Sequence, residues 1–266
     1  MRKNFVKEKL KRGESSLGAW LNLPGITPAR AMARLGFDWL LIDMEHSAYD
    51  PAIMAEMVGT IADAGTSAPL VRVPSSHSVE WFKWTLDAGA WGILAPMINT
   101  PQEAERVVSW SKYPPLGTRS IGGAFAPYGF GTTDRASYTK AANDEILVII
   151  QIESRDGLNN VEDILAVPGI DVAFVGPNDL HAQLGFPPSY DGTEPEFVAA
   201  LERIQAAAKK NHVATGIMAG DGASAAKRVQ QGFQLVTVTT DLNSMIAGAT
   251  RQLHQAQREG EQEKKG

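Results

Sequence analysis

The sequence contains no cysteine. This absence excludes disulfide scaffolds, thiolate metal sites and cysteine nucleophiles, and it fits a reducing compartment, so we expect a cytoplasmic protein. The chain also lacks any apolar run near the ~18 residues that span a membrane. Residues 1–13 are charged and have no apolar core, so we expect neither a signal peptide nor a membrane partner.

A strong excess of one charge is also missing. The chain has 25 basic and 30 acidic residues, a net charge of −5, and no basic cluster, so we expect no nucleic-acid partner. Its 266 residues suit one (β/α)8 domain, which typically needs about 250. We predict a single domain over 1–266, with a charged tail that frays over about 258–266.

Short apolar runs alternate with longer helical patterns along the chain. Runs that are apolar throughout are typical of parallel strands buried on both faces. We predict eight strands, at 17–22, 39–45, 70–73, 92–97, 146–153, 172–176, 215–219 and 235–240. Helices are predicted between them at 51–64, 78–88, 101–111, 155–166 and 194–211. This alternation predicts an α/β fold of the (β/α)8 type, a TIM barrel.

A doubly wound open sheet is the alternative arrangement of eight strands. It requires a Gly-rich phosphate loop after the first strand. The first strand is followed instead by Leu23-Pro24-Gly25, so the barrel is preferred.

The segment 113–143 is too long for an ordinary connection and is rich in proline and glycine. Long loops in compact domains are usually functional or disordered. We expect this insertion to climb to the carboxyl ends of the strands and to form part of the active-site rim.

Carboxylates follow two neighbouring predicted strands. Glu153 and Asp179 can converge over the barrel mouth, where the chemistry of such barrels takes place. Two carboxylates suit a hard divalent cation such as Mg²⁺ or Mn²⁺, and a salt bridge at the rim is the alternative for Glu153. Three histidines for a zinc site are not found at these strand ends.

Two further groups lie at predicted strand ends. Arg72 interrupts an apolar strand, so it is either neutralised by Asp43 or Glu45 or binds an anionic substrate oxygen. Asp43 precedes His46 by three residues and could fix the tautomer of the imidazole, which would then act as a general acid or base.

The predicted strands carry no lysine, so the Schiff base of a lysine-dependent aldolase is excluded and a keto acid would need a metal to stabilise its enolate.

The segment from Gly176 to Asp179 is a turn followed by a helix start. Its backbone N–H groups could hold a carboxylate, or Asp179 could simply cap the helix.

Taken together and in order, these motifs resemble the HpcH/HpaI family of class II, metal-dependent pyruvate aldolases. The resemblance runs from about Gly18 to the last helix. It is carried by Asp43-Met44-Glu45-His46, Val71-Arg72-Val73-Pro74, Tyr113-Pro114-Pro115-Leu116-Gly117-Thr118-Arg119-Ser120, Gln151-Ile152-Glu153-Ser154-Arg155 and Val175-Gly176-Pro177-Asn178-Asp179-Leu180. Met44 replaces a glycine that is common in the family, and the stretch 121–128, which neighbours the aldehyde there, is unusually apolar.

The resemblance implies a lyase that cleaves a 4-hydroxy-2-oxo acid reversibly to pyruvate and an aldehyde through a metal-stabilised pyruvate enolate. It also implies a homo-oligomer, commonly a hexamer. An oxaloacetate decarboxylase, or an enzyme like macrophomate synthase that uses the same enolate, is the alternative. A CoA-thioester lyase would need a basic groove, and a barrel without catalysis would lack one of the site residues, all of which are present.

The resemblance also implies roles for the site residues. Glu153 and Asp179 would bind the cation, Mg²⁺, Mn²⁺ or Co²⁺, and pyruvate would chelate it. Arg72 would hold the keto oxygen, and His46, oriented by Asp43, would be the acid–base residue. The remaining implied site residues are Glu45 and Gln151 behind the ligands, Asn178 and Asp179 at the pyruvate carboxylate, and Trp20 and Met218 near the pocket.

Overall fold

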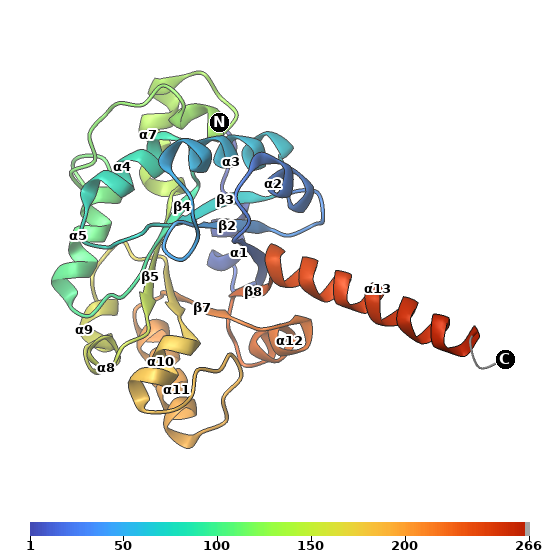
Figure 1. The fold of residues 1–266 in the computed structure, drawn as a ribbon. Coiled ribbons are helices and arrows are strands. Elements are labelled where there is room, and N and C mark those ends of the chain that lie inside the picture. The colour runs from blue at the N-terminus through green and yellow to red at the C-terminus, as the bar shows by residue number, and fades with distance from the viewer. Residues whose placement is uncertain (264–266) are drawn as a thin grey trace.

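Eight parallel strands closed into a barrel form the centre of the molecule (Figure 1). The computed structural model describes residues 1–263. The strands are β1 (Ser16–Leu21), β2 (Trp39–Asp43), β3 (Ala68–Arg72), β4 (Gly92–Ala95), β5 (Leu147–Ile152), β6 (Val172–Val175), β7 (Ala214–Met218) and β8 (Leu235–Thr240). Each strand pairs with the next, and β8 pairs with β1. The predicted TIM barrel is confirmed, with every strand within two residues of its predicted bounds.

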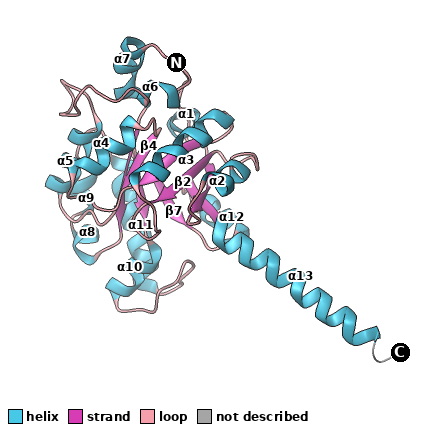
Figure 2. Ribbon diagram, turned by 45° about the horizontal axis from the view of Figure 1, so that its top comes forward, coloured by secondary structure: helices cyan, strands magenta, loops and turns pink. Residues whose placement is uncertain are grey.

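Helices surround the barrel (Figure 2). They are α2 (Ile26–Met32), α3 (Pro51–Ala64), α4 (Val79–Asp87), α5 (Pro101–Ser111), α8 (Arg155–Asn159), α9 (Val161–Leu165), α10 (Pro177–Leu184), α11 (Pro195–Lys210) and α12 (Gly222–Gln230). Helices α3 and α5 match their predicted bounds, because Asp50 and Thr100 cap them and proline follows each cap. The helix predicted at 155–166 is divided at Asn160, whose side chain donates to the carbonyl of Asn99.

Strands β2 to β6 are buried along their whole length, as parallel strands covered on both faces must be. Within these strands the side chains that can carry charge or form strong hydrogen bonds are Asp43, Arg72 and Gln151. All three lie at the carboxyl ends. Burying such groups is costly unless they are paired, so this end of the barrel is where a function is to be sought.

Helix α1 (Phe5–Lys11) covers the opposite, amino end of the barrel. The Asn4 side chain donates to the carbonyl of Trp91 at 3.1 Å, just before β4. Lys7 donates to the carbonyl of Ile146 and to the Asp171 carboxylate, both at 2.9 Å, before β5 and β6. The floor of the barrel is therefore held closed by hydrogen bonds from the N-terminal segment.

The insertion over 113–143 also lies at this amino end and contains α6 (Ala126–Gly129) and most of α7 (Arg135–Glu145). The Trp91 indole donates to the carbonyl of Gly129 at 2.8 Å and stacks on Phe130. Arg119 is buried over the ring of Tyr113 and donates to Asp87 at the end of α4. The expectation that this segment climbs to the active-site rim is therefore wrong, because aromatic and charged anchors hold it at the floor.

Helix α13 (Asp241–Glu263) projects away from the barrel instead of packing along it (Figures 1 and 2). Its apolar residues Met245, Ile246 and Leu253 are exposed. The tail predicted to fray is helical up to Glu263, its last residues, 264–266, lie outside the described part, and the fraying stays a prediction. Over the described residues, the chain has no helix that is both long and apolar enough to cross a membrane.

Candidate active site

A paired arginine lies at the carboxyl end of the barrel. Asp43 and Arg72 are the last residues of β2 and β3 and are register partners. Arg72 donates from Nε and Nη2 to the two carboxylate oxygens of Asp43, at 2.8 and 2.7 Å. Its Nη1 lies 2.9 Å from a Glu45 carboxylate oxygen, and its guanidinium lies 4.3 Å above the ring centroid of Trp20 on β1. Arg72 is thus fixed in position at 5% exposure.

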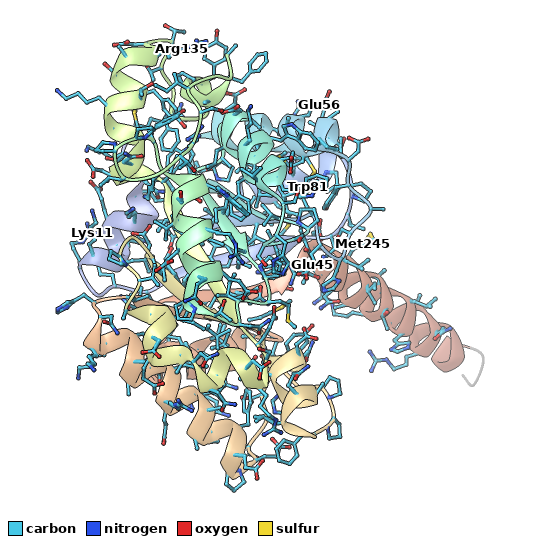
Figure 3. All side chains as sticks on the ribbon, turned by 90° about the vertical axis from the view of Figure 1, so that its left-hand side faces the viewer. Lys11, Glu45, Glu56, Trp81, Arg135 and Met245 are labelled. Carbon is cyan, nitrogen blue, oxygen red and sulfur yellow. The ribbon has the colours of Figure 1, made fainter. Side chains whose placement is uncertain are left out.

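The predicted dyad of Asp43 with the His46 imidazole is not formed. Asp43 accepts hydrogen bonds from Arg72, from the Asn22 amide and from the backbone N–H groups of Glu45 and His46. The His46 side chain is 65% exposed, and its Nε2 lies 3.8 Å from Glu45. Arg72, Asn22 and two backbone N–H groups donate to Asp43, and the carboxylate beside the His46 imidazole is Glu45. Figure 3 shows Glu45 at the end of the barrel opposite Lys11.

Glu153, directly after β5, is a buried carboxyl group with few compensating charges. It accepts from the backbone N–H of Met97 at 2.9 Å and from the side-chain amide of Gln151. Met97 has φ 54, a left-handed conformation that is uncommon outside glycine and is concentrated at functional sites. Burial raises the pKa of Glu153 to about 7; the Met97 N–H opposes this shift and the charge of Asp179 adds to it.

Asp179 comes from the first turn of α10, which begins directly after β6 and Gly176. A side chain at Gly176 would collide with Glu153 and with the amide of Gln151, so glycine allows the helix start to approach β5. The first N–H groups of a helix have no acceptor within the helix and favour anions. The backbone N–H groups of Asn178 and Asp179 are therefore hydrogen-bond donors that lie next to the side chains of Glu153 and Asp179.

The donor set fits a divalent cation. Over the part of the chain that the structure describes, Arg72 is paired with Asp43 and Glu45, whereas Glu153 and Asp179 have no ion pair with it, and both burial and acidic neighbours raise the pKa of Glu45. The Oε1 atom of Gln151 is buried without a partner among the described residues. The side chains of the described part bring no three of His, Asp or Glu together around one ion. Glu153 and Asp179 would therefore share a cation with water or substrate oxygens, as is usual for Mg²⁺.

One cavity of about 230 Å³ joins these groups. Eight of the ten predicted site residues line it: Trp20, Asp43, His46, Arg72, Gln151, Asn178, Asp179 and Met218. Glu45 and Glu153 lie behind this wall, where they contact Arg72 and Gln151. The structure thus brings all ten into one neighbourhood.

Sequence reasoning missed several wall residues. They are Asn22, Phe174, Pro177, Tyr190, Thr240, Leu242 and Asn243. All of them except Tyr190 lie within three residues of the carboxyl end of a strand, so a count of positions around each strand end could have found them. Tyr190 comes from the connection between α10 and α11, where no pattern in the sequence marks it.

Several known proteins are similar to this chain in sequence and in fold. Residues 16–248 match the model of a family described as HpcH/HpaI aldolase/citrate lyase. The chain is 42% identical over 255 residues to a hydroxypyruvate/pyruvate aldolase of Paraburkholderia phytofirmans, covering 94% of this chain and 95% of the relative. It is 37% identical over 258 residues to a 4-hydroxy-2-oxo-heptane-1,7-dioate aldolase of Salmonella dublin, covering 93% and 92%. A crystal structure of a family protein from Burkholderia cenocepacia J2315 has a TM-score of 0.86 and 40% identity, covering 96% of this chain and 99% of that one.

Proposed function

The chain belongs to the HpcH/HpaI aldolase/citrate lyase family, and from this premise we propose that it cleaves a 4-hydroxy-2-oxo acid reversibly into pyruvate and an aldehyde. It is a carbon–carbon lyase of the aldolase type. The observation that carries the proposal is the fixed, buried guanidinium of Arg72 in one small cavity with Asp179 and with Glu153 behind its wall.

Glu153 and Asp179 are the side chains that would hold a divalent cation, with Mg²⁺ or Mn²⁺ preferred and Co²⁺ as a further candidate. When bound, such an ion acts as a Lewis acid that polarises the keto group of pyruvate. Gln151 donates to Glu153 and so fixes the orientation of that carboxylate.

Arg72 stabilises the negative charge that develops on the keto oxygen as the carbon–carbon bond breaks and the enolate of pyruvate forms. Its planar fork is already oriented by Asp43, so little reorganisation is needed when the charge appears. The N–H groups at the start of α10, from Asn178 and Asp179, hold the pyruvate carboxylate. Trp20 supports Arg72 from below.

His46 is the acid–base residue of the proposal. Its imidazole is exposed at the cavity wall, where it can take the proton from the 4-hydroxyl group during cleavage and return it during synthesis. Glu45, at 3.8 Å from Nε2, is placed to orient it in place of Asp43.

The test follows the methyl signal of pyruvate in D2O by NMR, with EDTA-stripped protein before and after addition of Mg²⁺ or Mn²⁺. We expect loss of the signal that depends on the added ion, since enolate formation exchanges the methyl protons. Exchange that proceeds equally without the ion would overturn the role of the cation. No exchange under any condition, together with release of CO2 from oxaloacetate, would replace the aldolase by the decarboxylase alternative.

The exposed apolar residues of α13 support a homo-oligomer, and the expected state is a hexamer. Such residues on a projecting helix are typical of surfaces that another chain covers. A cytoplasmic location stays a prediction that rests on the cysteine-free sequence.

A further inference from the structure

One wall of the active-site cavity is formed by a side chain from outside the barrel. Tyr190 lies in the loop between α10 and α11 and lines the cavity together with Met218 at the end of β7. A Cβ atom added to Gly220, two residues beyond β7, would lie 3.3 Å from the Tyr190 ring. The ring therefore packs against the backbone that follows β7.

Two basic residues of α12 hold the segment that presents Tyr190. The Asp191 carboxylate lies 2.9 Å from Lys227 Nζ and 3.2 Å from Arg228 Nη2. The same Nη2 donates to the carbonyl of Tyr190 at 3.1 Å. Arg228 is itself buried, so its guanidinium is a fixed anchor for the loop.

A buried histidine holds the other end of the loop. His181 on α10 donates from Nδ1 to the carbonyl of Pro177 at 2.7 Å, and its Nε2 lies 3.3 Å from Glu194. A side chain at Gly192 would collide with this imidazole, so the loop backbone rests directly on it. Tyr190 is thus held from both sides, by α12 and by α10.

The cavity divides by chemistry into two parts. Arg72, Gln151 and Asp179 form the part with charged and amide groups, which suits the pyruvate moiety. Tyr190, Met218 and Leu242 line the part around the ends of β7 and β8, together with Thr240 and Asn243.

We propose that Tyr190 determines specificity by limiting the length of the aldehyde that the site accepts. This inference rests on the proposed aldolase function. The phenol ring stands where a longer chain would continue past Met218. The clamp of Asp191 with Lys227 and Arg228 keeps it from moving aside, so each added methylene meets a fixed wall.

The test is the ratio of kcat/KM for hexanal to that for glycolaldehyde, with pyruvate as donor, in wild type, Tyr190→Ala and Tyr190→Phe. A ratio cancels any common effect on enolate formation. We expect Tyr190→Ala to raise it by about 10- to 100-fold, because each methylene in such a pocket is worth roughly 10-fold or more. Tyr190→Phe keeps the ring and should leave the ratio near that of wild type. An unchanged ratio in a folded Tyr190→Ala protein would overturn the inference.

Asp191→Ala tests the clamp separately. Asp191 acts on specificity through Tyr190, so this variant should shift the ratio in the same direction but less, whereas Glu196→Ala, an exposed acid on α11, should not. If the kcat/KM ratio is unchanged in both Asp191→Ala and Tyr190→Ala, the proposed role of the loop is contradicted. Failure of the wild type to exchange pyruvate protons in D2O would instead overturn the proposed function itself, so the two failures can be told apart.

Discussion

Arg72 and Asp43 are register partners at the ends of neighbouring strands, and two hydrogen bonds of 2.8 and 2.7 Å join the Arg72 guanidinium to the Asp43 carboxylate. This pair orients the Arg72 guanidinium within the cavity. It also removes Asp43 from the role of partner to the His46 imidazole. The two readings of Arg72, neutralised by acids or bound to substrate, are compatible, because the acids hold the guanidinium in place.

Arg72→Ala should lower kcat by ~10²–10³, since it removes a donor aimed at developing negative charge. It also leaves the buried Asp43 carboxylate without a counter-charge, so a loss of stability by ~3–5 kcal/mol is expected. Arg72→Lys keeps the charge but loses the two-pronged geometry, and its kcat should also fall. Steady-state kinetics and thermal unfolding measure both effects. Wild-type kcat/KM in a folded Arg72→Ala protein would rule out the proposed role.

Glu153→Gln and Asp179→Asn should abolish turnover that depends on a divalent ion, because each removes a charged oxygen ligand. Binding of Mn²⁺ followed by electron paramagnetic resonance gives a readout independent of activity, and it should weaken in both variants. Asp156→Asn, at an exposed acid on α8, is the matched control. Full activity of either site variant in ion-replete buffer would show that the ligands are elsewhere.

The unfolding of ion-free protein should depend on pH through Glu153. Burial raises its pKa from 4.5 to about 7, so the folded state holds a proton that the unfolded state releases between these values. Stability from this group is therefore present below pH 4.5 and is lost as the pH rises toward about 7. This pKa shift corresponds to a change of about 3 kcal/mol in the free energy of unfolding. In EDTA, the difference in Tm between pH 5 and pH 8 should be smaller for Glu153→Gln than for wild type. If the two proteins show the same difference, Glu153 is not the group responsible.

The barrel and most of its site could be predicted because both follow from local patterns. Buried parallel strands are apolar throughout, so Asp43, Arg72 and Gln151 stand out in the sequence. The pairing between side chains was harder to predict from the sequence. Which acid faces His46 depends on where the Arg72 fork settles, and that depends on register and on Trp20 beneath it. Tyr190 and the insertion over 113–143 are positioned by long-range anchors that leave no periodic signal.

His46→Ala should slow the reaction by ~10²–10⁴, the usual contribution of a positioned acid or base. If Glu45 orients the imidazole, Glu45→Gln should shift the pH dependence of kcat more than Asn22→Ala does, since the side-chain amide of Asn22 donates to Asp43 and Ser47. The pH profiles of the variants measure this. A profile of Glu45→Gln that matches wild type would leave His46 without the proposed partner.

The projecting helix α13 should mediate self-association. Met245, Ile246 and Leu253 are exposed on one face of it by helical period, and an isolated chain would leave this apolar face in water. We expect wild-type protein to be a homo-oligomer by size-exclusion chromatography with light scattering. Ile246→Glu with Leu253→Glu should shift it to smaller species, because burying an unpaired charge in an interface is costly. Arg251→Glu, on the opposite face, is the control and should leave the mass unchanged. A wild-type protein that is monomeric at micromolar concentration would overturn the expectation, and dissociation by Arg251→Glu alone would place the contact on the other face of the helix.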